Sequence, residues 1–295
     1  MKNDKNVLRT SIHNFFNEII NIFNNHSKSD KIPSPEKLLF EKRDKTSSSN
    51  IELNSFDVQI IPENGDIFNL TTRITFELSN ICNYSLFHKK CPLFLENEKI
   101  ILPSKIVYAV LDELGRYNYK GQIAYHNYNE PLIDPRLFKF IEHSKIKCPD
   151  SEIYFSTNGF YLNQIMVDEL IEIGLNRLHI SAYSKNEYKR LKRINIRIPH
   201  SVELVSLDER LNKVCNSSNS NNKNPCLAPF NEIIINRDAK ISLCCLDWQR
   251  RYSFGDLHNQ TLEEIMRDGN LINIYNRLSR GDRFLDICKR CDWSR

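Results

Sequence analysis

The end of the chain carries the stretch that decides the fold, and this stretch has three parts: Cys226-Leu-Ala-Pro229-Phe230, Cys244-Cys245-Leu-Asp247-Trp248 and Cys288-Lys-Arg-Cys291. Five of the nine cysteines of the chain fall in it. A β-hairpin is predicted between the first two parts, over residues 231–245. Four thiolates complete an iron–sulfur cluster, and a rigid hairpin beside a Cys-x-x-Cys pair is a suitable geometry for one. The same thiols also suit zinc or disulfides, so the spacing leaves the metal open.

Composition narrows the class of protein. The 295 residues can form one large or two smaller domains, and the net charge of +4 is too small to predict a nucleic-acid or membrane-surface partner. No apolar run is long enough to span a bilayer, and the N-terminus lacks the apolar core of a secretory signal. Clustered cysteines without a signal predict a cytoplasmic protein, in which they serve metals or catalysis rather than disulfides.

Residues 1–70 are predicted to precede the main fold. Apolar side chains recur at helical spacing over residues 6–24, which predicts an amphipathic helix. Residues 25–50 are polar and predict a linker. Docking of the helix on the rest of the protein and binding to a partner or a membrane surface are both open for it.

From residue 72 onward the chain alternates strands and helices. Five strands are predicted, at 73–78, 122–125, 152–155, 177–180 and 202–205, with helices between them. Such an alternation predicts a parallel α/β sheet, in which functional residues gather at the carboxyl ends of the strands. The low-complexity segment 216–224 then marks a domain boundary. Beyond it, Thr261 and Glu264 predict the capping box of a later helix.

The cysteine pattern, followed by Phe254-Gly-Asp-Leu257, resembles the auxiliary-cluster region of radical SAM enzymes that carry a SPASM/Twitch domain. The resemblance covers roughly residues 72–295. It implies that one iron–sulfur cluster is bound by Cys226, Cys244, Cys288 and Cys291 and leaves Cys245 over. Because Cys245 adjoins Cys244 on a predicted strand, its side chain is expected to point to the opposite face. The family often has a glycine in the hairpin turn, whereas this chain has Arg237-Asp238-Ala239.

Three strand ends are similar to the elements with which this family binds S-adenosylmethionine. Asn129 and Glu130 follow the second strand, where the family binds the amino group of the cofactor. Ser156 and Asn158 lie in a Ser-Thr-Asn-Gly stretch that resembles the family's third-strand element. Ser181 follows the fourth strand, where the family often contacts the carboxylate or the ribose.

The loop after the first strand departs from the family. The family has three cysteines there, in the pattern Cys-x3-Cys-x2-Cys, whereas this loop has Cys82 and Cys91 and is two residues longer. His88 stands where the middle cysteine is expected. Imidazole replaces thiolate on iron in Rieske centres, so His88 is the candidate third ligand. The alternative is that His88 is a solvated loop residue.

Taken together, the resemblance implies an α/β fold: a shortened, partial (β/α) radical SAM barrel at 71–208 and a small C-terminal α+β SPASM/Twitch domain at 209–295. It implies two [4Fe–4S] clusters, S-adenosylmethionine, and an external electron donor such as flavodoxin or ferredoxin. The short barrel resembles that of aminocyclitol-oxidising members of the family more than that of the longer peptide-modifying members. This resemblance implies a carbohydrate- or aminocyclitol-like small molecule as substrate, oxidised or epimerised through a 5′-deoxyadenosyl radical. Cys245 and Cys215 are the candidate hydrogen donors for epimerisation. A maturase of a ribosomal peptide and a degenerate scaffold that holds only the auxiliary cluster are the alternatives.

Overall fold

A computed structural model describes residues 67–85, 91, 93, 98–205, 223–289 and 291. They all belong to one compact unit, Val58–Arg295. The predicted helix at 6–24 and the predicted domain boundary near residue 208 lie outside the described residues, so the three-part division stays a prediction. Among the described helices, none has both the length and the apolar character needed to cross a membrane.

In the part of the chain that the structure describes, eight strands form one open sheet in the order β5-β4-β3-β2-β1-β6-β7-β8. All neighbours from β5 to β6 are parallel, and β6, β7 and β8 are antiparallel. The strands are β1 Arg73–Phe76, β2 Gln122–Ala124, β3 Glu152–Thr157, β4 Arg177–Ala182, β5 His200–Leu204, β6 Glu232–Ile235, β7 Ile241–Ser242 and β8 Ser253–Phe254.

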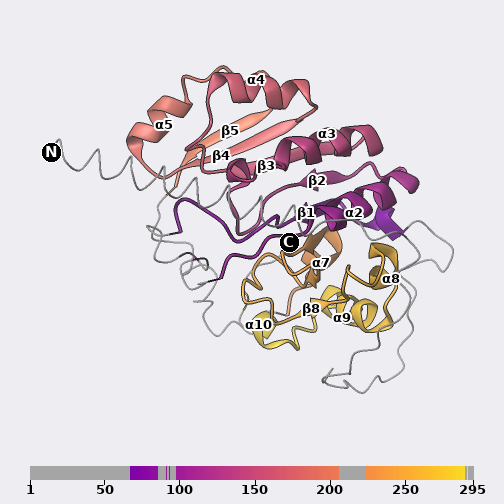
Figure 1. Cartoon of the computed structure of the whole chain (residues 1–295). Coiled ribbons are helices and arrows are strands. Elements are labelled where there is room, and N and C mark those ends of the chain that lie inside the picture. The colour runs from indigo at the N-terminus through magenta and orange to yellow at the C-terminus, as the bar shows by residue number, and fades with distance from the viewer. Residues whose placement is uncertain are drawn as a thin grey trace. The chain divides into compact units, whose positions relative to one another are not determined.

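Helices connect the parallel strands and cover one face of the sheet, as Figure 1 shows. They are α2 Ser104–Arg116, α3 Leu137–Lys147, α4 Gln164–Glu172 and α5 Lys185–Leu191, with 3₁₀ turns at η2 Ile67–Leu70 and η4 Pro131–Ile133. Short helices fill the C-terminal region: α7 Ala228–Asn231, α8 Leu262–Met266, α9 Gly269–Ser279 and α10 Asp286–Lys289. The capping box predicted for Thr261 and Glu264 begins α8.

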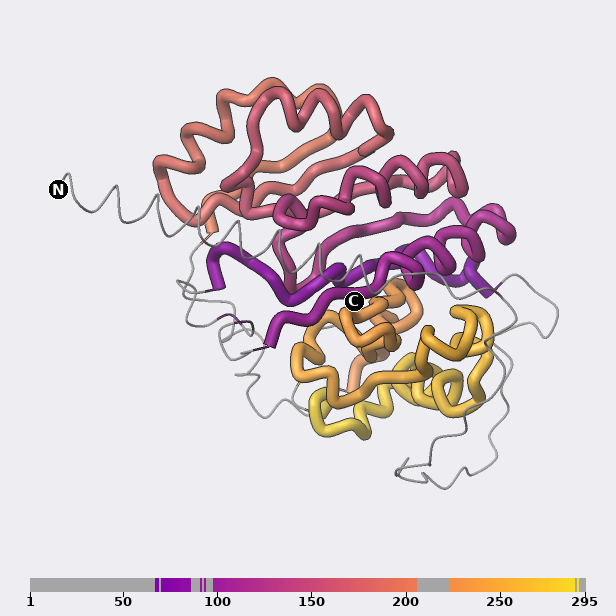
Figure 2. Tube along the Cα trace, viewed as in Figure 1, coloured from indigo at the N-terminus to yellow at the C-terminus, as the bar shows by residue number. Residues whose placement is uncertain are grey.

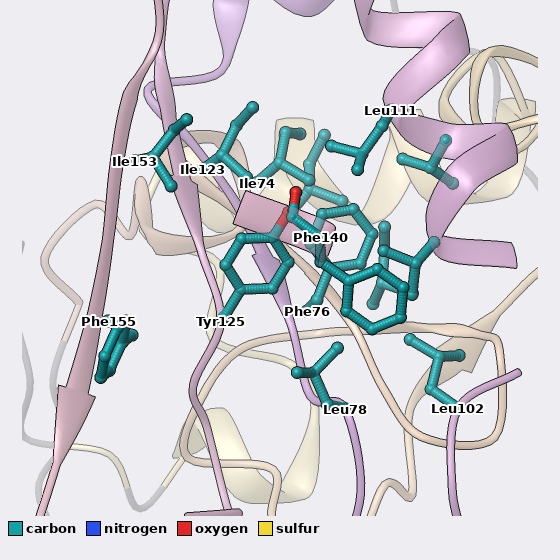
Figure 3. Packing of buried hydrophobic residues seen from close by; sticks show 14 of the residues in the cluster. Ile74, Phe76, Leu78, Leu102, Leu111, Ile123, Tyr125, Phe140, Ile153 and Phe155 are labelled. Carbon is teal, nitrogen blue, oxygen red and sulfur yellow. The ribbon is translucent and has the colours of Figure 1, made fainter. Parts of the chain in front are cut away.

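The core lies between the sheet and these helices. Alternate residues of each strand point into it, because successive side chains of a strand face opposite sides. Figure 3 shows Phe76 and Tyr125 packed beside Phe140 of α3. The Tyr125 hydroxyl is fully buried and donates to the Phe140 carbonyl at 3.0 Å, which satisfies the one polar atom that this ring brings into the core.

The C-terminal region continues the same sheet. Strand β6 pairs in parallel with β1, from Arg73 opposite Glu232 to Phe76 opposite Ile235, and Figure 2 shows this segment beside the first strand. The predicted five-stranded barrel therefore has a sixth parallel strand, supplied by the hairpin of the cysteine region. The predicted α/β class, with a partial barrel and a small C-terminal α+β region, is confirmed.

A carboxylate of the barrel joins the two regions. Glu113 of α2 is buried and accepts hydrogen bonds from the backbone amides of Leu262 at 3.0 Å and Glu263 at 2.7 Å. These amides begin α8 and have no partner inside that helix, so Glu113 satisfies them from outside. The contact fixes the C-terminal helices against the barrel.

Candidate metal centre and cofactor site

The C-terminal thiols surround a cavity of about 210 Å³. Cys226, Cys244, Cys245 and Cys291 line it, together with residues from the beginning of β1 and β6. Cys226 precedes α7, Cys244 follows β7, and Cys291 follows α10, so three separate elements bring these thiols to one place. The fourth predicted ligand, Cys288 in α10, is buried beside them.

The C-terminal thiols raise one another's pKa. Burial, together with the neighbouring Cys226 and Cys291 thiols, raises the pKa of the Cys288 thiol to about 12. Burial also raises the pKa of Cys244 well above its ordinary value, and the Cys245 and Cys288 thiols add to that shift. Backbone amides two and three residues after Cys244 act in the opposite direction by hydrogen bonding to its sulfur. Thiolates this close together require a compensating positive charge, which bound iron supplies.

The donor set fits an iron–sulfur cluster. Among the described residues, no three His, Cys, Asp or Glu side chains converge closely enough to hold a single metal ion. The thiols instead face a cavity from different sides, as the four cysteines around a [4Fe–4S] cluster do. Amide hydrogen bonds to a ligand sulfur, as at Cys244, are one means by which proteins set the potential of such a cluster.

Cys245 lies on the same side as Cys244. An extended strand through both residues would place them on opposite faces, but β7 ends at Ser242 and Cys244–Asp247 form a turn closed by a 3.1 Å backbone hydrogen bond. Both residues line the thiol cavity, and the Cys245 thiol is close enough to raise the pKa of Cys244. The expectation that the two side chains point apart is wrong, because the strand stops before them.

The first-strand loop brings two of its predicted ligands together. Cys91 is buried against Tyr128, and Cys82 and Trp248 pack against this small cluster. His88 lies outside the described residues, so its role as third ligand stays a prediction. Trp248 comes from the turn that carries Cys244 and Cys245, so this turn also contacts the first cysteine loop.

Glu130 assembles three strand-end loops. Its backbone amide donates to the Ile81 carbonyl at 2.8 Å. Its buried carboxylate accepts hydrogen bonds from the Thr157 hydroxyl at 2.5 Å, the Asn158 amide at 2.8 Å and the Leu132 amide at 3.1 Å. Burial raises the pKa of Glu130 to about 7, although these hydrogen bonds lower it. Protein donors thus occupy the carboxylate, and its predicted contact with the cofactor's amino group stays a prediction.

Two asparagines complete this end of the sheet. The Asn158 side chain donates to the Asn83 amide oxygen at 2.7 Å and lies 3.9 Å from the Cys82 sulfur, so the third-strand element contacts the cysteine loop directly. Asn129 accepts a hydrogen bond from the Asn127 amide, but its side-chain nitrogen is buried and has no partner among the described residues. A buried donor in this state fits a ligand with an acceptor oxygen, such as a carboxylate or a ribose.

The structure says less about the remaining predicted site residues, Ser156, Ser181 and Cys215. Ser156 and Ser181 are half-buried on neighbouring strands, on the face of the sheet away from the helices. Cys215 lies outside the described residues. The assignment of these residues to the cofactor or to hydrogen donation stays a prediction.

Two polar links between the cysteine regions were not predicted. The Tyr128 hydroxyl donates to the Cys245 carbonyl at 2.7 Å. Arg237, in the hairpin turn, forms an ion pair with Glu77 at 2.8 Å, and both side chains are 1% exposed. The signal for Glu77 was present in the sequence, because it continues the alternation Arg73, Thr75, Glu77.

Ala239, in the same hairpin turn, takes the backbone conformation, φ 58°, that glycine adopts without steric cost.

Comparison with known proteins finds matches for the C-terminal region and for the fold. The model of the SPASM family, described as an iron–sulfur cluster-binding domain, matches residues 226–292. The S-adenosyl-L-methionine-dependent 2-deoxy-scyllo-inosamine dehydrogenase of Niallia circulans is 21% identical over 237 residues, which cover 76% of this chain and 93% of that protein. Two crystal structures of BtrN, one in complex with AdoMet and 2-DOIA and one of the SeMet protein in an open conformation, are 19% identical and match with TM-scores of 0.62 and 0.60. They cover 76% of this chain and 93% and 92% of those chains. Residues 226–292 therefore match a SPASM iron–sulfur cluster-binding domain, and the chain shares the fold of these S-adenosylmethionine-dependent proteins.

Proposed function

We propose that this protein is a radical SAM oxidoreductase that oxidises a small, polyhydroxylated, aminocyclitol-like molecule at carbon. The observation that carries the proposal is the position of the thiol cavity, which is bordered by Arg73 and Glu232 on the barrel sheet. A substrate on that sheet lies beside the auxiliary cluster. The relative from Niallia circulans, which acts on an aminocyclitol and spans the same barrel and C-terminal region, supports this substrate class.

The proposed binding sites for the two clusters lie at two different ends of the sheet. Cys82 and Cys91, with His88, bind the first cluster, and the loops around Asn129, Glu130, Ser156, Asn158 and Ser181 hold S-adenosylmethionine. When bound, the reduced cluster and S-adenosylmethionine supply a 5′-deoxyadenosyl radical that removes a hydrogen atom from the substrate. The four C-terminal thiols would hold a second cluster, which would accept the remaining electron. Flavodoxin or ferredoxin provides the electrons from outside, as expected for a cytoplasmic enzyme.

The test is formation of 5′-deoxyadenosine. The anaerobically reconstituted protein is reduced with dithionite and incubated with S-adenosylmethionine, with and without 2-deoxy-scyllo-inosamine. We expect 5′-deoxyadenosine, and with the aminocyclitol an oxidised product in equal amount. A protein with a full auxiliary cluster that never forms 5′-deoxyadenosine contradicts an enzymatic role and supports the degenerate scaffold.

Epimerisation remains the second candidate because of Cys245. Cys245 lines the same cavity as Arg73 and Glu232, and a thiol is a competent donor of a hydrogen atom. An epimerised product formed in heavy water carries one solvent deuterium at the reacting carbon, and Cys245→Ala abolishes that incorporation. An oxidised product without deuterium, formed equally by Cys245→Ala, excludes the thiol donor.

A further inference from the structure

A chain of polar side chains crosses five neighbouring strands on the inner face of the sheet, the face opposite to helices α2–α5. Arg73 donates to Glu232 at 3.4 Å and to Gln122 at 3.0 Å. Gln122 donates to Glu152 at 2.8 Å, and Glu152 pairs with Arg177 at 3.2 Å. We name these residues the inner-face belt; in strand order they are Glu232, Arg73, Gln122, Glu152 and Arg177.

The belt follows from strand register. Arg73 lies opposite both Glu232 and Gln122, and Gln122 lies opposite Glu152, so three adjacent pairs of strands place these side chains side by side. The residues next to them in each strand, such as Ile74 and Ile153, point into the core on the other face. Core packing thus occupies one face of these strands and leaves the belt on the other.

Three observations indicate that the belt faces a ligand. Its charged side chains keep 19–36% of their surface exposed, so the core does not cover them. Arg73 and Glu232 border the thiol cavity. The Nε atom of Arg177 is buried and has no hydrogen-bond partner among the described residues, and buried donors in native proteins are almost always paired.

Tyr154 gives this face its rigidity. The residue is 3% exposed, and both guanidinium groups contact its ring, with Arg177 4.3 Å and Arg73 5.4 Å from the ring centre. His179 contacts the same ring edge to face at 5.8 Å and bonds to Ser201 at 3.0 Å. The cations and carboxylates are therefore held in fixed positions before any ligand arrives, which lowers the entropy cost of binding.

The charges select the chemistry of the ligand. Carboxylates and guanidinium groups alternate along the belt, and their formal charges sum to zero. A hydroxyl group can donate to a carboxylate and accept from the neighbouring guanidinium, and an amino group can donate to either carboxylate. A phosphate bound to either guanidinium would, by contrast, lie beside a carboxylate of the same negative charge, which would repel it. We infer that the inner-face belt is the recognition surface for the hydroxyl and amino groups of a neutral or singly cationic polyhydroxylated ring, and that it disfavours phosphorylated sugars.

That this ligand is the substrate rests on the proposed function, but binding itself can be measured without turnover. Equilibrium binding of 2-deoxy-scyllo-inosamine and of glucose 6-phosphate is followed by calorimetry on the reconstituted protein. Arg177→Gln and Glu152→Gln each remove one charged partner, and we expect each to weaken binding of the aminocyclitol at least about tenfold, as for a hydrogen bond to a charged group. Arg197→Gln is the matched control, because Arg197 pairs with Asp168 on the exposed surface and lies outside the belt.

Iron content and the midpoint of urea unfolding are measured on every variant, so that a loss of binding is interpreted only for variants that remain folded. Glu152→Gln preserves the shape of the side chain and tests the belt if Arg177→Gln is unstable. Aminocyclitol binding that is equal in wild type and both belt variants, tighter binding of glucose 6-phosphate, or no binding of either probe by wild type overturns the inference. Aminocyclitol binding that depends on the belt, in a wild-type protein that forms no 5′-deoxyadenosine, upholds the belt and overturns the proposed function instead.

Discussion

Glu130 gives the sharpest test of how the strand-end loops are held together. The carboxylate is fully buried, accepts three hydrogen bonds, and has its pKa raised to about 7 by that burial. Glu130→Gln keeps the size and shape of the side chain and removes the titration. The substitution therefore isolates the pH dependence that this one carboxyl contributes to stability.

The direction of the pH dependence of stability follows from proton linkage. A carboxyl whose pKa is higher in the folded than in the unfolded protein contributes stability that is fully present below the unfolded value and is lost as the pH rises through the folded value. The folded value is about 7, and the unfolded value is about 4.3. Each pKa unit corresponds to about 1.4 kcal/mol, so the free energy of unfolding falls by about 3 to 4 kcal/mol as the pH rises through the range between the two pKa values.

The assay is urea unfolding of cluster-free wild type and Glu130→Gln at a series of pH values. The difference between the two proteins cancels the titration of all other groups. Between about pH 5 and about pH 8 we expect wild type to lose about 2.5 kcal/mol relative to the variant. Glu142→Gln, which removes an exposed carboxyl of α3, is the matched control. Parallel pH profiles for wild type and Glu130→Gln refute the reasoning.

Three further substitutions test the links around the thiol cavity. Cys288→Ser should lower iron by about four atoms per chain after anaerobic reconstitution, whereas Cys245→Ser should not; equal loss in both contradicts the ligand assignment. Arg237→Met should cost about 3–5 kcal/mol in urea unfolding because it removes the cationic partner of the buried Glu77 carboxylate, and the double variant with Glu77→Gln should cost less than the sum; additive costs argue against the pair. Tyr128→Phe should cost about 1 kcal/mol with full iron content, since it removes one hydrogen bond to a carbonyl; loss of iron would assign Tyr128 a larger role.

Local sequence patterns predicted most of the elements correctly. Strands β1 to β5 lie within a few residues of the predicted ranges, and the capping box of Thr261 and Glu264 forms, because alternation and capping depend on neighbours in the chain. Cys226, Cys244, Cys288 and Cys291 were predicted as one set from their spacing and the family resemblance, and the structure brings them together. The prediction for Cys245 was wrong because strand periodicity was extended past the end of β7.

The sequence by itself therefore determined which segments are strands and helices, since these depend on spacing along the chain, and its family resemblance implied which thiols belong together. Only the tertiary structure decided that β6 joins β1 and supplies a sixth parallel strand, that Arg237 pairs with Glu77 across 160 residues, and that the inner-face belt is continuous. Each strand shows alternating polar residues in the sequence, but their register across strands depends on which edges pair. Pairing between distant strands is a property of the folded sheet, so the belt and its cavity could not be read from the chain alone.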